Sequence, residues 1–236
     1  MSAKRKLEVV GKARRRIDGR GKVTGQARFA DDLSLPRMLH AKLLRSTHPH
    51  AIIEAIDVTR AHAYPGVHLV LTGKDFPIPF GIMPVSYDEY PLAPERVRYV
   101  GDPVAAVIAR DEKTAEEALK LIEVKYKPLP TIASPQEGLA HPESRIHDYG
   151  EQGNIHRNQS YEFGDVEEAL AGSDHVFEDL FFYEGDTHLP MEQQASLATI
   201  EGDGKLLISS STQTSCPSSR NLRSSTYSPL QASGCR

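Results

Sequence analysis

Residues 96–130 have the sequence RVRYVGDPVAAVIARDEKTAEEALKLIEVKYKPLP, and this stretch decides the fold class. Its first part, residues 97–109, is rich in valine and alanine and is broken only by Gly-Asp-Pro at 101–103, which predicts strand structure. Its last part, residues 122–130, alternates apolar and charged residues and ends at prolines, which predicts another strand.

The residues between these two strands predict a helix. Asp111 is a residue type that caps helix N-termini. Ala115, Ala118, Leu119 and Ile122 follow at intervals of three and four residues, so they share one helical face. Strand, helix and strand in about 30 residues form a compact α+β element, and this order is compatible with a crossover connection.

Three further strands are predicted upstream of this element. They cover residues 38–46, 51–58 and 67–73, where apolar residues form short runs or alternate with polar ones. Residues 59–64 predict a short helix that ends before Pro65.

Three upstream segments predict irregular structure. Residues 1–16 are strongly charged and predict a poorly ordered arm. Residues 17–36 are rich in glycine and aspartate and predict a loop that leads into the first strand. Residues 76–95 carry five prolines and predict mostly loop.

The chain after residue 131 predicts a second region. Residues 132–160 have few apolar anchors and predict a linker. Residues 164–173 predict a short helix, and residues 175–184 alternate like a strand. Residues 195–211 predict a hairpin, because two strand-like runs flank a Gly-Asp-Gly turn.

Charge and hydropathy exclude several classes of function. The 236-residue chain has a formal net charge of −4, which gives no reason to expect nucleic acid or an anionic membrane as a partner. No apolar run approaches the roughly 20 residues of a membrane span. The amino-terminal residues are basic but lack the apolar core of a secretory signal, so we expect a cytoplasmic protein.

The composition changes abruptly after residue 213. Residues 214–236 contain no acidic residue, both cysteines and seven serines, whereas all 32 acidic residues precede them. The serine, proline and arginine bias predicts disorder. A natural disordered tail and a frameshifted, aberrant end both fit this break, and the interrupted motif described below favours the aberrant end.

Two short motifs have ligand-binding character but are incomplete. GRGKVTG at residues 19–25 lacks the serine or threonine that a phosphate-binding P-loop needs after its lysine, and it does not follow a strand. His48 and His50 are a residue type that binds zinc, but no cysteine or acidic cluster completes a site. An exposed turn is the favoured interpretation of the histidine pair.

Two positions near the hairpin have polar groups of interest. His188 and Glu192 flank Pro190, which prevents a regular helix, so they form either a tight turn or a wall beside a cofactor pocket. Gln213 stands at the end of the last strand and can both donate and accept hydrogen bonds.

Several segments together resemble a known family. RIDGRGKVTGQARFADDLSLPRMLHAKLLRSTHPHAIIEAIDV, PGVHLVLTGKDFP, the 96–130 stretch and EGDTHLPMEQQASLATIEGDGKLLISSSTQT occur in the same order as in the molybdopterin-binding large subunit of the xanthine dehydrogenase/aldehyde oxidase family. The resemblance covers residues 14–214, nearly all of the chain before the break in composition.

The resemblance implies a fold and a cofactor site. Residues 17–131 would form an α/β hammerhead domain, and residues 161–213 would begin the first molybdopterin-binding domain, which is incomplete. In this family the glutamine of Ser-Thr-Gln lies close to an oxo ligand of molybdenum, so the resemblance implies that Gln213 would be the cofactor-binding residue. The Pro-His element and glycine-rich segment that follow it in the family are not found after Thr214, and no catalytic residue or metal ligand is predicted before it.

The resemblance also implies a reaction and partners. Within the family, the segments FGIMPVSYDEYPLAPERVRYVGDPVAAV, GNIHRNQSYEFGDVEEAL and FFYEGDTHLPMEQQA are most similar to the branch that reduces 4-hydroxybenzoyl-CoA. Molybdopterin would carry the redox chemistry, and electrons would pass through iron–sulfur clusters and FAD on partner subunits. The chain alone is expected to be inactive. Hydroxylation of an aldehyde, a purine or another N-heterocycle, and a non-catalytic docking module, are the alternatives.

Overall fold

The computed structural model describes two compact units of the chain. One unit holds residues 36–186, and the other holds residues 9–35 together with residues 187–211. Within these limits the structure describes residues 9–80, 88–149, 153–187, 189–190 and 192–211.

The first sheet of the larger unit is antiparallel and has β5 at its centre. β1 (His40–Arg45), β5 (Pro103–Ala109) and β3 (Val67–Thr72) follow one another in the order β1-β5-β3. β5 is buried along nearly its whole length, which explains why its sequence PVAAVIA is a continuous apolar run.

The second sheet has β2 at its centre. β4 (Arg96–Val97), β2 (Ala51–Asp57) and β6 (Glu123–Pro128) follow in the order β4-β2-β6, and both pairings are antiparallel. β6 alternates half-buried and exposed residues, as its sequence predicts for a sheet with one solvated face.

Helix α3 (Glu112–Leu119) connects the two sheets and begins as the sequence predicts. The Asp111 carboxylate accepts a hydrogen bond from the Thr114 backbone N–H at 2.7 Å, which confirms the predicted cap. The crossover interpretation is wrong, because β5 and β6 lie in different sheets and each pairs with strands from earlier in the chain.

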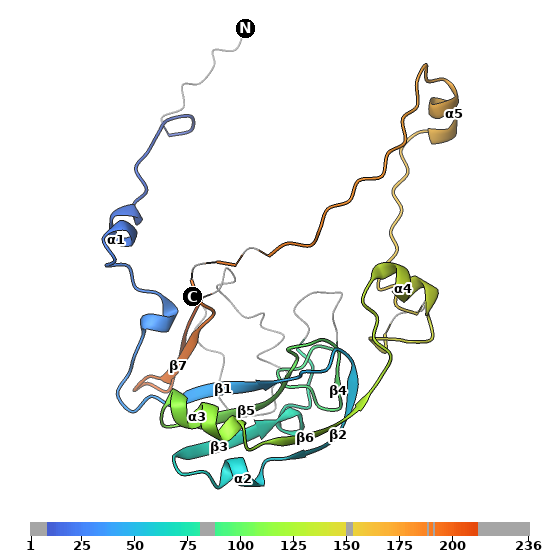
Figure 1. Ribbon diagram of the computed structural model, residues 1–236. Coiled ribbons are helices and arrows are strands. Elements are labelled where there is room, and N and C mark those ends of the chain that lie inside the picture. The colour runs from blue at the N-terminus through green and yellow to red at the C-terminus, as the bar shows by residue number, and fades with distance from the viewer. Residues whose placement is uncertain (1–8, 81–87, 150–152, 188, 191, 212–236) are drawn as a thin grey trace. The chain divides into compact units, whose positions relative to one another are not determined.

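One apolar core lies between the first sheet and its helices. Figure 1 shows α3 beside β1 and β5, and α2 (Thr59–His62) beside β3. Alanine dominates the buried set, which lets the helices approach the sheet closely. The buried members are Ala61, Val70, Ala105, Val107, Ala109, Ala115, Ala118 and Ile122.

A smaller core joins the second sheet to the loop before β4. It contains Ala51, Ala93, Val97 and Val104, with β6 packed against it. The 3-10 turn η2 (Gly73–Asp75) also approaches this loop, and a Cβ atom on Gly73 would lie 2.4 Å from the Pro94 Cα atom. Glycine is therefore required where β3 leaves the first sheet.

The segment between residues 132 and 160 contains more structure than its composition predicts. It includes α4 (Pro135–Ala140), whose cap residue Ser134 accepts a hydrogen bond from the Glu137 backbone N–H. Helix α5 (Val166–Ala171) follows within the predicted range 164–173.

The strand predicted at residues 175–184 is not present in the described structure. These residues form neither helix nor strand and are exposed throughout. A strand needs a neighbour to pair its backbone, and none of the described strands pairs with this segment.

The smaller unit contains the predicted hairpin. β7 (Ser196–Ile200) and β8 (Leu206–Ser210) pair antiparallel around a turn in which Gly204 adopts a positive φ of 82°. The residues predicted as a leading loop, 17–36, contain a short helix, α1 (Gly19–Val23), and a 3-10 turn, η1 (Ala30–Asp32). β7 contacts η1.

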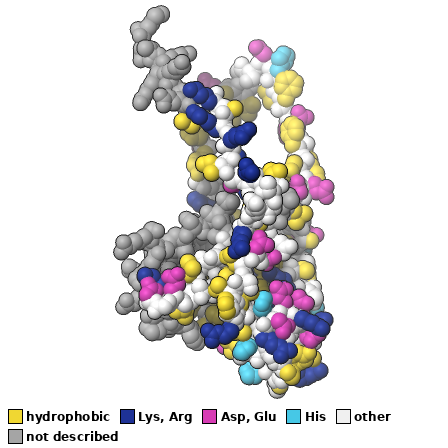
Figure 2. Space-filling view, turned by 90° about the vertical axis from the view of Figure 1, so that its left-hand side faces the viewer, with side chains coloured by type: hydrophobic (Ala, Val, Ile, Leu, Met, Phe, Trp, Pro, Cys, Tyr) yellow, Lys and Arg dark blue, Asp and Glu magenta, His cyan; other side chains and the backbone are white. Residues whose placement is uncertain are grey.

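The surface carries charges of both signs, and the described helices are short. Acidic and basic side chains are interspersed on the face that Figure 2 shows. None of the helices in the described ranges is both long and apolar enough to cross a bilayer.

Candidate functional site

The residue predicted to contact the cofactor, Gln213, lies outside the described residues, as does His188. Glu192 is described and exposed. The proposed roles of these three residues therefore remain predictions.

The histidine pair of the first region has two different sets of neighbours. His50 is buried, and its Nδ1 atom donates a hydrogen bond to the Pro130 carbonyl oxygen at 2.8 Å. The His48 ring packs against Tyr126 with ring centroids 4.8 Å apart. Among the described residues, no three histidine, cysteine or acidic side chains gather as metal ligands.

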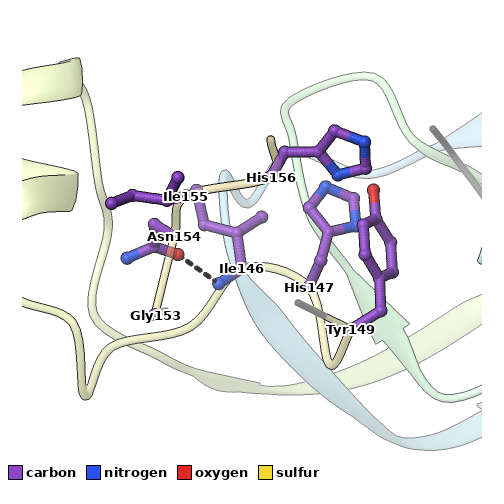
Figure 3. A pocket seen from close by; sticks show the side chains of 7 residues that line it. All are labelled: Ile146, His147, Tyr149, Gly153, Asn154, Ile155 and His156. Atoms are coloured by element: carbon purple, nitrogen blue, oxygen red, sulfur yellow. Dashed lines mark hydrogen bonds between the residues drawn. The ribbon is translucent and has the colours of Figure 1, made fainter. Parts of the chain in front are cut away.

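The described residues bring several polar side chains together where the chain leaves the second sheet. Residues 144–149 and 153–156, which we call the strap, follow α4 and enclose a cavity of about 60 Å³. Figure 3 shows the seven residues between Ile146 and His156 that line this cavity.

Asn154 closes the strap on itself and on α4. Its side-chain oxygen accepts a hydrogen bond from the Ile146 backbone N–H at 3.0 Å, the bond drawn in Figure 3. Its side-chain nitrogen lies within 3.1–3.3 Å of the carbonyl oxygens of Gly138, His141 and Ser144. One amide thus satisfies backbone groups that a loop of this shape would leave unpaired.

Gly153 allows the strap to close. It has a positive φ of 60°, and a Cβ atom at this position would lie 2.7 Å from the Pro142 Cβ atom. Any larger residue would push the two ends of the loop apart.

Arg98 and Asp88 connect the strap to the second sheet. Arg98 Nη2 lies 3.2 Å from the Asp88 carboxylate, and Arg98 Nε donates a hydrogen bond to the Ile146 carbonyl oxygen at 3.0 Å. His147 Nδ1 lies 2.9 Å from the same Asp88 carboxylate. Asp88 therefore has two basic partners: Arg98 beside the second sheet and His147 in the strap.

Asp148 extends this network to the surface. Its carboxylate lies 3.1 Å from Arg96 and 3.7 Å from Arg98. Because Asp148 is 69% exposed, solvent screens these two pairs far more than the pair of Arg98 and Asp88, which are 16% and 20% exposed.

Three rings pack at the cavity wall. The Tyr149 ring lies 5.2 Å from that of His147 and meets that of His156 edge-on at 5.0 Å, as Figure 3 shows. Burial raises the pKa of Tyr149, and the nearby carboxylates of Asp88 and Glu89 raise that pKa further.

The chemical capacity of this cluster is limited to positioning. The cavity is far smaller than the roughly 300 Å³ of a typical ligand pocket, and it has room only for water-sized molecules. A more open, apolar hollow of about 480 Å³ lies beside it, with Ile132, Leu139 and Ile146 in its wall. The hydrogen bonds of the cluster hold the strap in place.

Sequence patterns could not have identified this cluster. Asp88 and His147 are 59 residues apart in the chain, and neither lies in a motif with ligand spacing. Asp88 lies in the segment predicted as a proline-rich loop, and His147 lies in the predicted linker. β2 pairs with both β4 and β6, which places the chain before β4 and the chain after β6 beside the same sheet.

Two family models match the chain in consecutive order. The model described as "Aldehyde oxidase and xanthine dehydrogenase, a/b hammerhead domain" matches residues 24–130. The model described as "Molybdopterin cofactor-binding domain" matches residues 146–225. The strap thus lies at the start of the second match.

Curated relatives agree with these matches. A probable xanthine dehydrogenase subunit of Bacillus subtilis is 43% identical over 203 residues, which are 85% of this chain and 27% of that protein. The nicotinate dehydrogenase large molybdopterin subunit of Eubacterium barkeri is 36% identical over 208 residues, which are 87% of this chain and 48% of that protein. The chain spans between a quarter and a half of the length of these relatives.

Solved structures agree with the fold. The quinoline 2-oxidoreductase of Pseudomonas putida is 32% identical, with a TM-score of 0.75 over 88% of this chain and 27% of that chain. The aldehyde oxidoreductase of Desulfovibrio gigas is 29% identical, with a TM-score of 0.72 over 82% of this chain and 22% of that chain. The predicted α+β fold, a hammerhead domain followed by the start of a molybdopterin-binding domain, is confirmed.

The described residues do not by themselves form a molybdopterin site. Residues 157–187, which fall within the second match, are exposed throughout, whereas a bound cofactor needs enclosing hydrogen-bond donors. No catalytic step can be assigned to the described side chains. The two consecutive family matches nevertheless establish the ancestry of the chain: it belongs to the aldehyde oxidase and xanthine dehydrogenase family of molybdenum-dependent oxidoreductases.

Proposed function

We propose that the chain supplies the hammerhead domain and the beginning of the molybdopterin-binding domain of a hydroxylase that acts on an aromatic N-heterocycle. The observation that carries this proposal is the consecutive match of both family models. The names of the relatives favour the substrate class, because xanthine, nicotinate and quinoline are all aromatic N-heterocycles.

The reaction of such an enzyme is a two-electron oxidation. A ring C–H bond is replaced by C–OH, water supplies the oxygen atom, and two electrons and two protons are released. The bound molybdopterin would supply the redox chemistry, while the protein would position the substrate and exclude side reactions. Gln213 is the one residue of this chain that we propose to contact the cofactor.

Partner subunits would carry the electrons away. We infer an iron–sulfur subunit and an FAD subunit, in a heteromeric complex located in the cytoplasm. The relative in Paenarthrobacter nicotinovorans, subunit gamma of the 6-hydroxypseudooxynicotine dehydrogenase complex, supports a multi-subunit arrangement by its name and is 33% identical over 198 residues.

A second candidate reaction runs in the opposite direction. We infer it only from the resemblance of the segments at residues 80–107, 153–170 and 181–195 to the branch that reduces 4-hydroxybenzoyl-CoA. There the phenolic hydroxyl of an aromatic CoA thioester would be replaced by hydrogen, consuming two electrons and two protons and releasing water. Hydroxylation of an aldehyde and a docking module without chemistry are the remaining alternatives.

Substrate assays on the native complex separate these candidates. A tag at the amino terminus would retain the chain with its natural partners from its own organism. Oxidation of xanthine or nicotinate with an artificial electron acceptor supports the hydroxylase. Turnover only of 4-hydroxybenzoyl-CoA, with reduced ferredoxin as donor, supports the second candidate and overturns the first. Partner subunits without either activity favour the docking module.

A further inference from the structure

Arg98 is the point where three segments of the larger unit meet. Its backbone N–H donates a hydrogen bond to the Asp102 carboxylate at 3.0 Å, which anchors it to the turn before β5. Its side chain pairs with Asp88 at 3.2 Å and donates to the Ile146 carbonyl oxygen at 3.0 Å. The guanidinium group therefore joins the second sheet, the loop before β4 and the strap.

Burial makes this contact different from the surface ion pairs of the chain. The side chains of Arg98 and Asp88 are 16% and 20% exposed. By contrast, Arg60 and Glu123 form a pair at 3.3 Å in which both partners are more than 60% exposed. Solvent screens the exposed pair, whereas loss of Arg98 would leave the Asp88 charge half-enclosed beside His147.

The strap has hydrogen bonds and contacts of its own that do not involve the second sheet. Asn154 links it to α4 through the carbonyl oxygens of Gly138, His141 and Ser144, and Gly153 fits against Pro142. Because the loop has its own internal hydrogen bonds, its attachment to the sheet depends on the few groups that cross the contact. Arg98 contributes two of these interactions from one side chain, to the Ile146 carbonyl oxygen at 3.0 Å and to the Asp148 carboxylate at 3.7 Å.

We propose that Arg98 is a positioning residue that fixes the strap to the hammerhead domain, so that the polypeptide enters the molybdopterin-binding region as a docked segment and not as a free linker. The family match that begins at residue 146 starts inside this strap. The inference concerns the apoprotein chain and holds whether or not the proposed substrate is correct.

Native-state hydrogen exchange of the full chain tests this role. In the unmodified chain, peptides covering residues 144–149 should exchange more slowly than peptides from residues 157–186, which are exposed. Arg98→Met should accelerate exchange of the strap peptides by about tenfold or more, because it removes hydrogen bonds to a charged group. Arg60→Met, the matched exposed variant, should leave the strap peptides unchanged.

The exchange pattern separates positioning from general stability. Peptides from β5 should keep their protection in Arg98→Met, whereas a general loss of stability would accelerate β5 and the strap together. Arg98→Lys should restore part of the protection, since a lysine keeps a positive charge near Asp88 but lacks the planar fork of donors with which Arg98 reaches Asp88 and Ile146 together. Strap exchange that is unchanged in Arg98→Met, or that rises only in parallel with β5, would overturn the proposal.

A milder variant keeps the test decisive if Arg98→Met does not fold. Asp148→Asn removes the carboxylate that Arg96 and Arg98 share, and this residue is 69% exposed, so folding should be preserved. It should accelerate strap exchange relative to the unmodified chain, without affecting β5, and unchanged strap exchange would count against the proposal. The unmodified chain is itself a test. If its strap peptides exchange as fast as its peptides from residues 157–186, the inference is wrong.

Discussion

At two positions of the larger unit, only glycine fits between the neighbouring atoms. Gly73 and Gly153 both lie so close to other parts of the chain that a Cβ atom added to either glycine would overlap with neighbouring atoms. Gly73 faces the Ala93 and Pro94 backbone, which cannot move aside as a flexible side chain could. The geometry alone therefore excludes larger residues at these two positions.

Gly73→Ala should destabilise the larger unit by about 1–3 kcal/mol, the usual cost of forcing an extra methyl group into a packed site. The added Cβ atom would lie 2.4 Å from Pro94 Cα and 2.5 Å from the Ala93 carbonyl oxygen. Urea unfolding followed by circular dichroism measures the change. Gly202→Ala is the control, since a methyl group there would meet nothing within 4 Å and the φ of Gly202 is not positive. If both variants lower the free energy of unfolding equally, the close contact at Gly73 is not the cause of the loss.

The residues of the strap cluster show why a site can escape sequence analysis. Asp111 was predictable as a cap because its partner Thr114 lies three residues away. Arg98 and Ile146 are 48 residues apart, and their contact depends on strand pairing that no local pattern specifies. Local interactions were therefore predictable, and this cluster was not.

At the scale of elements, helix α3 depends on its cap. The Thr114 hydrogen bonds and the Arg110 side chain lower the pKa of the Asp111 carboxyl group from its ordinary 3.8. A lowered pKa in the folded state means that the stabilisation is present above this ordinary value and is lost as the pH falls through the lowered one.

Asp111→Ala should therefore destabilise α3 at neutral pH, and the difference from the unmodified chain should shrink in acid. Asp111→Asn is the matched control, because asparagine also caps helices but does not titrate. Thermal unfolding between neutral pH and a pH below the ordinary aspartate pKa measures both effects. A constant difference between Asp111→Ala and the unmodified chain across this range would contradict the cap as the source of the pH dependence.

The predicted elements succeeded where a segment carries its own signal. The strands at 38–46, 51–58 and 67–73 were found, because apolar patterning fixes their buried faces. The strand predicted at 175–184 was not found, since its apolar residues have no neighbouring strand in the described structure. The alternating pattern indicates what a segment can form, and a partner decides whether it does.

At the scale of the whole molecule, the chain has a large amount of exposed apolar surface after the strap. Five large side chains between residues 176 and 182 are more than 60% exposed: Val176, Phe177, Leu180, Phe181 and Phe182. Large apolar side chains exposed together in one short segment favour binding to another surface or aggregation.

The isolated chain should consequently bind the dye ANS strongly and associate with itself at micromolar concentration. The double variant Phe181→Ser/Phe182→Ser should reduce both signals, because it removes two apolar side chains that are 88% and 89% exposed. Val100→Ser is the control, as Val100 is 65% exposed but lies apart from this segment in the chain. Dye fluorescence and light scattering that are equal in all three proteins would contradict this account.

The proposed role in a molybdenum enzyme is tested most directly by metal analysis. The chain expressed alone should contain no molybdenum, because its described residues do not enclose a cofactor. The decisive measurement is the molybdenum content of the complex that an amino-terminally tagged chain retains in its own organism. Our account predicts that molybdenum, iron and flavin are recovered together in fixed ratio; a complex recovered without molybdenum would contradict it.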